Sequence, residues 1–184
     1  MFRHIDPWTY EERQNCQEIF SRVLLGPQNS SKDLSLLQRL RVTDIILVRS
    51  PSGIETTMLR PRFEELRYHI IEMEDNAVVS SQRLFSSFVT QVNSLLAAEG
   101  VRVLVIGASG MNRSAALVAA AVIATHRLAT DDAIEYLVGR RRCVAISAAL
   151  MRQLKEFEVT STAETATGTT RSKRNREQSD TIHC

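Results

Sequence analysis

The residues best suited to chemistry in this sequence lie in a short loop between two apolar segments. Residues 101–106 form a run rich in β-branched side chains, which predicts a strand, and the alanine-rich residues 115–125 predict a helix. Two glycines allow the loop's backbone N–H groups to face inward, and the N-terminus of the helix adds the positive end of its dipole. Arg113 supplies a planar fork that matches phosphate oxygens, and Ser114 supplies a hydroxyl. The pattern therefore predicts a phosphate-binding loop, called the phosphate loop below, formed by Gly107, Ala108, Ser109, Gly110, Met111, Asn112, Arg113 and Ser114.

The end of the phosphate loop resembles a motif of the cysteine-dependent protein phosphatases, in which His-Cys is followed by five residues, an arginine and a serine or threonine. Six residues before Arg113, where that motif has its cysteine, this sequence has Gly107, and Ile106 replaces the histidine. The sequence thus resembles a dual-specificity protein phosphatase that lacks its nucleophile. It is more closely similar to the STYX-like group, the serine/threonine/tyrosine-interacting pseudophosphatases, in which glycine occupies the cysteine position. The resemblance covers residues 18–158 and implies an α/β fold of the cysteine-phosphatase type, with a central, mostly parallel sheet flanked by helices.

The same resemblance indicates which chemistry is missing. In active members of the family the cysteine thiolate attacks phosphorus, and an aspartic acid protonates the leaving oxygen. Gly107 has no side chain that could attack. Asp75 stands 32 residues earlier and matches the position of the acid, although it could equally cap a turn with the two residues that follow it. We therefore expect no enzymatic activity and no catalytic residue, with Gly107 and Asp75 as vestigial positions.

Two other functions remain open. The first is an active tyrosine or serine/threonine phosphatase with a displaced nucleophile, for which Ser109 is the candidate, although no base is spaced beside it. The second is a nucleotide-binding domain, because the spacing from Gly107 to Arg113 mimics the motif G-x-x-x-x-G-K-[ST], from which Asn112 and Arg113 nevertheless depart. Arg113 itself could be a structural residue that bonds loop carbonyls.

The hydrophobic pattern predicts the elements that position this loop. Apolar, β-rich runs predict strands at residues 20–25, 42–48, 68–73 and 101–106. Helical periodicity and capping residues predict helices at residues 31–40, 80–98, 114–127, 130–138 and 147–158. The helix after the phosphate loop has so few polar residues that we expect it to be buried.

Length and composition bound the remaining possibilities. The 184 residues, 43% of them hydrophobic, predict one globular domain at residues 20–158, preceded by an arm at 1–19 and followed by a disordered tail at 159–184. A net charge of +2 is too small to indicate a nucleic-acid surface, and no segment is apolar enough to span a membrane. The three cysteines, Cys16, Cys143 and Cys184, show no metal-ligand spacing and indicate a reducing location. We expect no metal and no cofactor.

Two further segments bear on partner binding. Arg140, Arg141 and Arg142 could recognise acidic or phosphorylated partners, or could form a solvated face. The turn at residues 145–147 reads Ala-Ile-Ser where relatives contain asparagine and proline, which indicates a different shape beside the phosphate loop. The basic cluster at residues 171–176 is a candidate nuclear-import signal.

These observations favour a monomeric, catalytically inactive phosphatase homologue that binds phosphorylated or signalling proteins. It would act as an anchor, competitor or scaffold in kinase and phosphatase signalling. The resemblance implies MAP kinases or ubiquitin-ligase components as partner classes, while composition argues against nucleic acid and membranes. We expect the protein in the cytoplasm and the nucleus.

Overall fold

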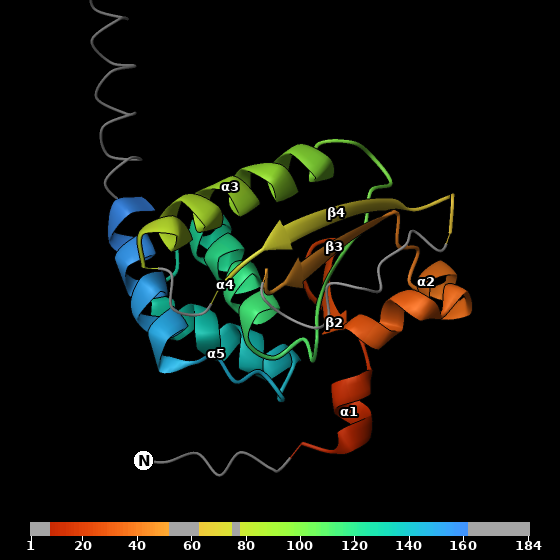
Figure 1. Cartoon of the computed structure of the whole chain (residues 1–184), viewed down its shortest axis with the longest axis horizontal. Coiled ribbons are helices and arrows are strands. Elements are labelled where there is room, and N and C mark those ends of the chain that lie inside the picture. Colours follow the sequence, from red (N-terminus) through yellow and green to blue (C-terminus); the bar gives the residue numbers. More distant parts are fainter. Residues whose placement is uncertain (1–7, 52–62, 75–77, 162–184) are drawn as a thin grey trace, which may run out of the picture.

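The computed structural model describes residues 8–51, 63–74 and 78–161 and contains a five-stranded sheet with helices on both faces (Figure 1). Across the sheet, the strands follow the order β1 (Gln17–Phe20), β2 (Val23–Pro27), β5 (Val103–Gly107), β3 (Asp44–Arg49) and β4 (Arg67–Glu72). The β1–β2 pair is antiparallel, and the other three pairings are parallel. The predicted α/β fold with a mostly parallel sheet is therefore confirmed. Because β5 is the central strand, its carboxyl end places the phosphate loop at the middle of one sheet edge.

The two faces of β5 contribute to two separate cores. Val103 and Val105 pack into the larger core, whereas Leu104 and Ile106 pack into the smaller one. This alternation is what a strand buried on both faces requires, since successive side chains point to opposite sides. The central strand is thus fixed from both sides, and the loop that follows it starts from a rigid base.

Helices cover the two faces unequally, as Figure 1 shows. The larger core contains side chains of helices α3 (Val78–Leu96), α4 (Arg113–His126), α5 (Thr130–Arg140) and a last helix at residues 148–161. The opposite face carries α2 (Leu34–Arg39), whose Leu37 packs into the smaller core, and a 3-10 helix (Gln28–Lys32) precedes it. The short helix α1 (Tyr10–Gln14) buries none of its residues.

Helix α4 is buried almost along its whole length, as its composition predicts. Residues from Ser114 to Ile123 are all buried, and the helix contacts both α3 and α5. Its alanines allow those two neighbours to approach closely. Helix α4 is therefore held inside the larger core. The phosphate loop is thus fixed at both ends, by β5 before it and by α4 after it.

The predicted strand at residues 20–25 is wrong in one respect, because the chain reverses direction within it. Arg22 adopts a left-handed conformation with φ of 66°, and β1 and β2 form a hairpin around it. Its backbone N–H donates to Glu18 at 2.9 Å, and its guanidinium donates to the carbonyls of Leu96 and Ala98 at the end of α3. Such backbone strain persists only where contacts of this kind compensate for it. The first three of the four residues of β1 consequently lie inside the segment expected to be an arm.

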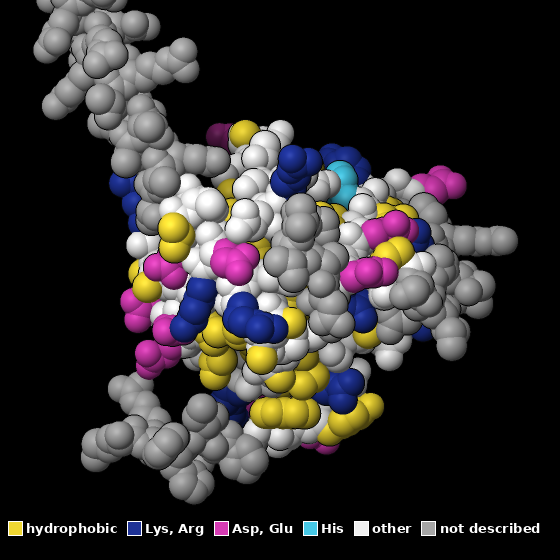
Figure 2. Space-filling view, turned by 60° about the vertical axis from the view of Figure 1, so that its left-hand side comes forward, with side chains coloured by type: hydrophobic (Ala, Val, Ile, Leu, Met, Phe, Trp, Pro, Cys, Tyr) yellow, Lys and Arg dark blue, Asp and Glu magenta, His cyan; other side chains and the backbone are white. Residues whose placement is uncertain are grey.

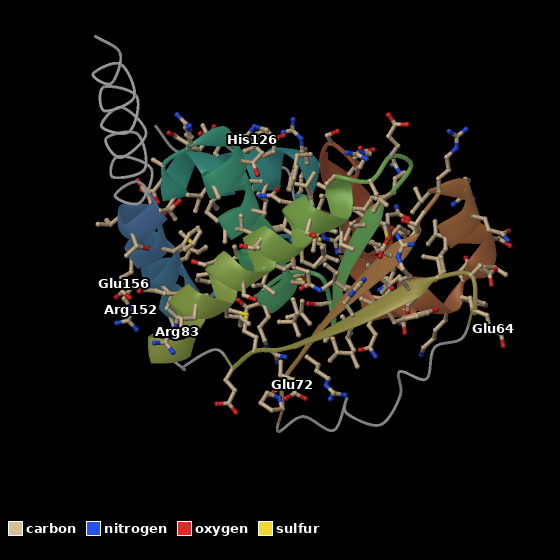
Figure 3. All side chains as sticks on the ribbon, turned by 90° about the horizontal axis from the view of Figure 1, so that it is seen from above. Glu64, Glu72, Arg83, His126, Arg152 and Glu156 are labelled. Atoms are coloured by element: carbon tan, nitrogen blue, oxygen red, sulfur yellow. The ribbon has the colours of Figure 1, made fainter. Side chains whose placement is uncertain are left out.

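The last helix extends to residue 161, beyond the predicted end at residue 158. Figure 3 shows Arg152 and Glu156 of this helix beside Arg83 of α3, and Gln82 donates to Glu156 at 3.4 Å. Glu158 accepts hydrogen bonds from the backbone and the hydroxyl of Thr130, which joins the last helix to the start of α5. Within the described segments, no helix is long and apolar enough to cross a membrane. The basic cluster at residues 171–176 and Cys184 lie outside them.

Candidate phosphate-binding site

The phosphate loop surrounds a hollow at the carboxyl end of β5. The hollow has a volume of about 70 Å³ and is lined by Val48 of β3 and by all eight residues of the loop. Gly107 is the last residue of β5, Asn112 is the N-cap of α4, and Arg113 is the first residue of that helix. The N-terminus of α4 therefore faces the hollow with the positive end of its dipole, and no acidic residue occupies its first turn. The structure thus brings together every residue expected to bind phosphate.

Gly110 is required by both conformation and space. Its φ of 67° lies in the left-handed region, and a Cβ at this position would lie 2.5 Å from the carbonyl oxygen of Gly26 in β2. The loop can therefore pack against β2 only because residue 110 lacks a side chain.

Arg141 holds the phosphate loop from outside the hollow. Its side chain, with 1% exposure, donates to the carbonyls of Gly110 at 2.9 Å and Ser109 at 3.1 Å. It also donates to the carbonyls of Arg13 and Asn15 and to the side chain of Gln17, so it joins the loop to the N-terminal segment. Because Arg141 engages the carbonyls of two consecutive loop residues, it fixes the backbone of the loop from outside the hollow. Burial lowers the pKa of Arg141, which nevertheless remains charged at neutral pH.

The three consecutive arginines form neither a shared recognition surface nor a uniformly solvated face, because their side chains have different environments. Arg141 is buried, Arg142 pairs with Glu12 of α1, and the Arg140 guanidinium lies 3.5 Å from the ring centre of Tyr136. Arg141 is also the functional residue that the sequence interpretation missed. Arg141 is the C-cap residue of α5 and has a non-helical backbone, so helical spacing in the sequence does not predict which of the three arginines is buried.

The turn at residues 145–147 is bound directly to the phosphate loop. The backbone N–H of Ala145 donates to the Met111 carbonyl at 3.0 Å, and that of Ser147 donates to Asn112 Oδ1 at 2.8 Å. The turn therefore holds the phosphate loop at Met111 and fixes Asn112, the N-cap residue of α4.

Ser114 and Gly107 share one space at the floor of the hollow. Ser114 is 1% exposed, and its Oγ has no hydrogen-bond partner among the described residues. A Cβ built on Gly107 would lie 2.9 Å from Ser114 Oγ and 3.2 Å from Ser114 Cβ. The serine side chain thus extends into the place that a side chain at residue 107 would use.

Neither of the two cysteines in the described part of the chain lines the hollow. The described cysteines, Cys16 and Cys143, are free, and burial raises the pKa of both thiols despite the opposing effect of nearby Arg141. They are therefore protonated at neutral pH and poor nucleophiles. Asp75, the predicted vestigial acid, lies outside the described residues.

Comparison with known proteins agrees with this geometry. The family model described as dual specificity phosphatase, catalytic domain, matches residues 23–160. The serine/threonine/tyrosine-interacting protein of Homo sapiens is 35% identical over 156 residues, which are 83% of this chain and 69% of that protein. Dual specificity protein phosphatase 2 of Mus musculus is 31% identical over 142 residues, 77% of this chain and 42% of that protein.

A solved structure shows the same arrangement. The crystal structure of human tyrosine phosphatase-like serine/threonine/tyrosine-interacting protein superimposes with a TM-score of 0.72 at 33% identity and covers 80% of this chain and 97% of its own. The predicted resemblance to the STYX-like group is thereby confirmed. With the family model matching most of its length, this chain belongs to the dual-specificity phosphatase family.

Proposed function

We propose that this protein is a pseudophosphatase, which binds phosphorylated or signalling proteins and does not dephosphorylate them. The observation that carries the proposal is the combination of a complete phosphate loop with the absence of any side chain at Gly107. The loop retains its hollow, its helix N-terminus and Arg113, which are the parts that bind a phosphoryl group. The loop has no cysteine side chain at residue 107 that could attack the phosphorus atom of that group.

The other residues of the site offer no replacement nucleophile. Ser114 is buried in the hollow, and among the described residues no histidine, aspartate or glutamate lines the hollow that could remove its proton. The same holds for Ser109, the candidate in the alternative of an active phosphatase, since an unassisted hydroxyl is a weak nucleophile.

The partners are proposed to be phosphorylated signalling proteins, with MAP kinases and ubiquitin-ligase components as the classes to test first. The names of the relatives describe those proteins as interacting with serine, threonine and tyrosine. Figure 2 shows hydrophobic side chains gathered on one face with basic side chains beside them, a mixture suited to a protein surface that contacts another protein. The protein would act as a monomeric anchor, competitor or scaffold in the cytoplasm and the nucleus.

Phosphate titration and an activity assay together test this proposal. Inorganic phosphate should shift the backbone amide signals of residues 107–114, and Arg113→Met should weaken binding by about tenfold to a hundredfold, because charge-assisted hydrogen bonds are lost. Release of phosphate from an aryl phosphate and from phosphopeptides should stay at background. Turnover that survives repurification and disappears in Ser109→Ala would instead establish the active enzyme.

A further inference from the structure

No hydrogen bond within the described part of the protein accounts for the burial of the Ser114 hydroxyl. Ser114 is the second residue of α4, and the N-cap, Asn112, makes no side-chain capping bond to the helix. The hydroxyl of Ser114 is buried, lines the hollow and bonds to none of the described residues. Buried polar groups are nearly always paired, so a buried hydroxyl that faces a lined hollow is suited to a ligand.

Gly107 is what allows the hydroxyl to lie there. The φ of Gly107 is outside the left-handed region, so the backbone would accept any residue at this position. Space is the restriction: an added Cβ would meet the Ser114 side chain at 2.9 and 3.2 Å, closer than ordinary contacts permit. Glycine at 107 and the observed position of Ser114 Oγ therefore depend on each other.

We propose that Ser114 is a direct ligand of the bound phosphoryl group, and that Gly107 is required for this contact. Ser114 Oγ–H donates to a terminal phosphoryl oxygen from the floor of the hollow, where the side chain of residue 107 would otherwise lie. This inference rests on the proposed function, because it concerns how the same hollow holds its ligand. Glycine at this position then improves binding of the phosphoryl group, besides removing the means to attack it.

The test is a set of single and double substitutions titrated with inorganic phosphate and with a phosphotyrosine peptide. Ser114→Ala should weaken phosphate binding by about tenfold, since one hydrogen bond to a charged acceptor is lost. Gly107→Ala should weaken it similarly, because the new methyl group displaces the hydroxyl. In the double variant the loss should not exceed that of one substitution, since both remove the same contact. If the phosphopeptide shows the same pattern as inorganic phosphate, the contact is to the phosphoryl group that both ligands share.

A matched control and a stability measurement separate binding from folding. Ser30→Ala removes another buried hydroxyl, which lies near the Cys16 thiol and outside the hollow, and should leave phosphate affinity unchanged. Ser114→Ala should keep or raise Tm in phosphate-free buffer, because the hydroxyl makes no bond that the folded protein would lose.

The outcomes distinguish this inference from the proposed function. Wild-type affinity in Ser114→Ala, with binding still lost in Arg113→Met, would overturn the inference and leave the proposed function standing. Additive losses in the double variant would show that Gly107→Ala acts by another route and would overturn the coupling. Absence of phosphate binding to the wild-type protein at millimolar concentration would overturn both.

Discussion

At residue 107, the proposed lack of phosphatase activity coincides with a constraint on side-chain packing. Gly107 ends a strand whose last apolar residue, Ile106, is fully buried in the smaller core. Any side chain at residue 107 competes with Ser114 for space, whereas residue 106 faces away from the hollow and into apolar neighbours. The two substitutions that would introduce a His-Cys pair therefore differ in difficulty. Gly107→Cys requires only that the Ser114 hydroxyl rotate, whereas Ile106→His places a polar ring in an apolar core.

We predict that Gly107→Cys creates weak but measurable phosphatase activity. The new thiol would stand where α4 and the loop N–H groups stabilise its anionic form, and a rotated Ser114 hydroxyl could donate to it. Adding Ile106→His should cost about 2–4 kcal/mol of unfolding free energy, because an imidazole replaces a core side chain. Aryl phosphate hydrolysis and urea denaturation measure the two effects.

Asp75→Asn in the Gly107→Cys background should lower the rate by about 10²-fold or more if Asp75 acts as the acid. A folded Gly107→Cys protein without activity would mean that the loop geometry no longer suits attack.

At the scale of elements, α5 and the N-terminal segment converge on the phosphate loop through one side chain. Arg141 follows the last residue of α5 and reaches three carbonyls or amides of residues 13–17 as well as two loop carbonyls. Helix α1 buries none of its own residues, so Arg141 and the Arg142–Glu12 pair account for much of its attachment. The shape of the loop therefore depends on segments that are far from it in sequence.

We predict that Arg141→Met lowers the unfolding free energy by about 3–5 kcal/mol, because several buried acceptors lose their donor at once. Phosphate affinity should fall as well, since the Ser109 and Gly110 carbonyls are released. Arg140→Met is the matched control: it removes an exposed stacking contact with Tyr136 and should cost about 0.5–1 kcal/mol without a change in affinity. Denaturation curves and phosphate titration measure both variants. Equal stability losses in the two would contradict the central role assigned to Arg141.

At the scale of the whole molecule, the sheet carries its charge network at the end opposite the phosphate loop. Asp44, the first residue of β3, is fully buried and accepts hydrogen bonds from Arg67 at 2.8 and 2.7 Å and from Thr43 at 2.7 Å. His69 Nε2 lies 3.0 Å from the same carboxylate. Burial alone would raise the pKa of Asp44, but the hydrogen bonds from Arg67, His69 and Thr43 outweigh it and lower the pKa. This network ties the start of β3 to the edge strand β4.

We predict that acid weakens the fold through this carboxylate. Because its pKa is lower in the folded protein, Asp44 stabilises the fold above its unfolded pKa of about 3.9 and loses that contribution as pH falls through the folded value. Asp44→Asn should be about 2–4 kcal/mol less stable than wild type at pH 7, and the difference should shrink below about pH 4. Urea denaturation from pH 7 to pH 3 measures it. A constant difference across that range would show that ionisation of Asp44 does not contribute.

The phosphate loop and the buried helix after it could be predicted from residue patterns, and the mostly parallel sheet from the family resemblance. These features depend on local signals: β-branched runs, turn glycines and the composition of one helix, all within about 25 residues of Gly107 for the loop and its helix. The residue patterns did not predict which of three consecutive arginines is buried, where the Ser114 hydroxyl lies, or that the chain reverses at Arg22. Each of these features depends on contacts between segments that are distant in sequence, such as the hydrogen bond from Arg141 to the Arg13 carbonyl across 128 residues. The space and the hydrogen-bond partners at one position are set by the element that packs against it, and local residue patterns do not identify that element.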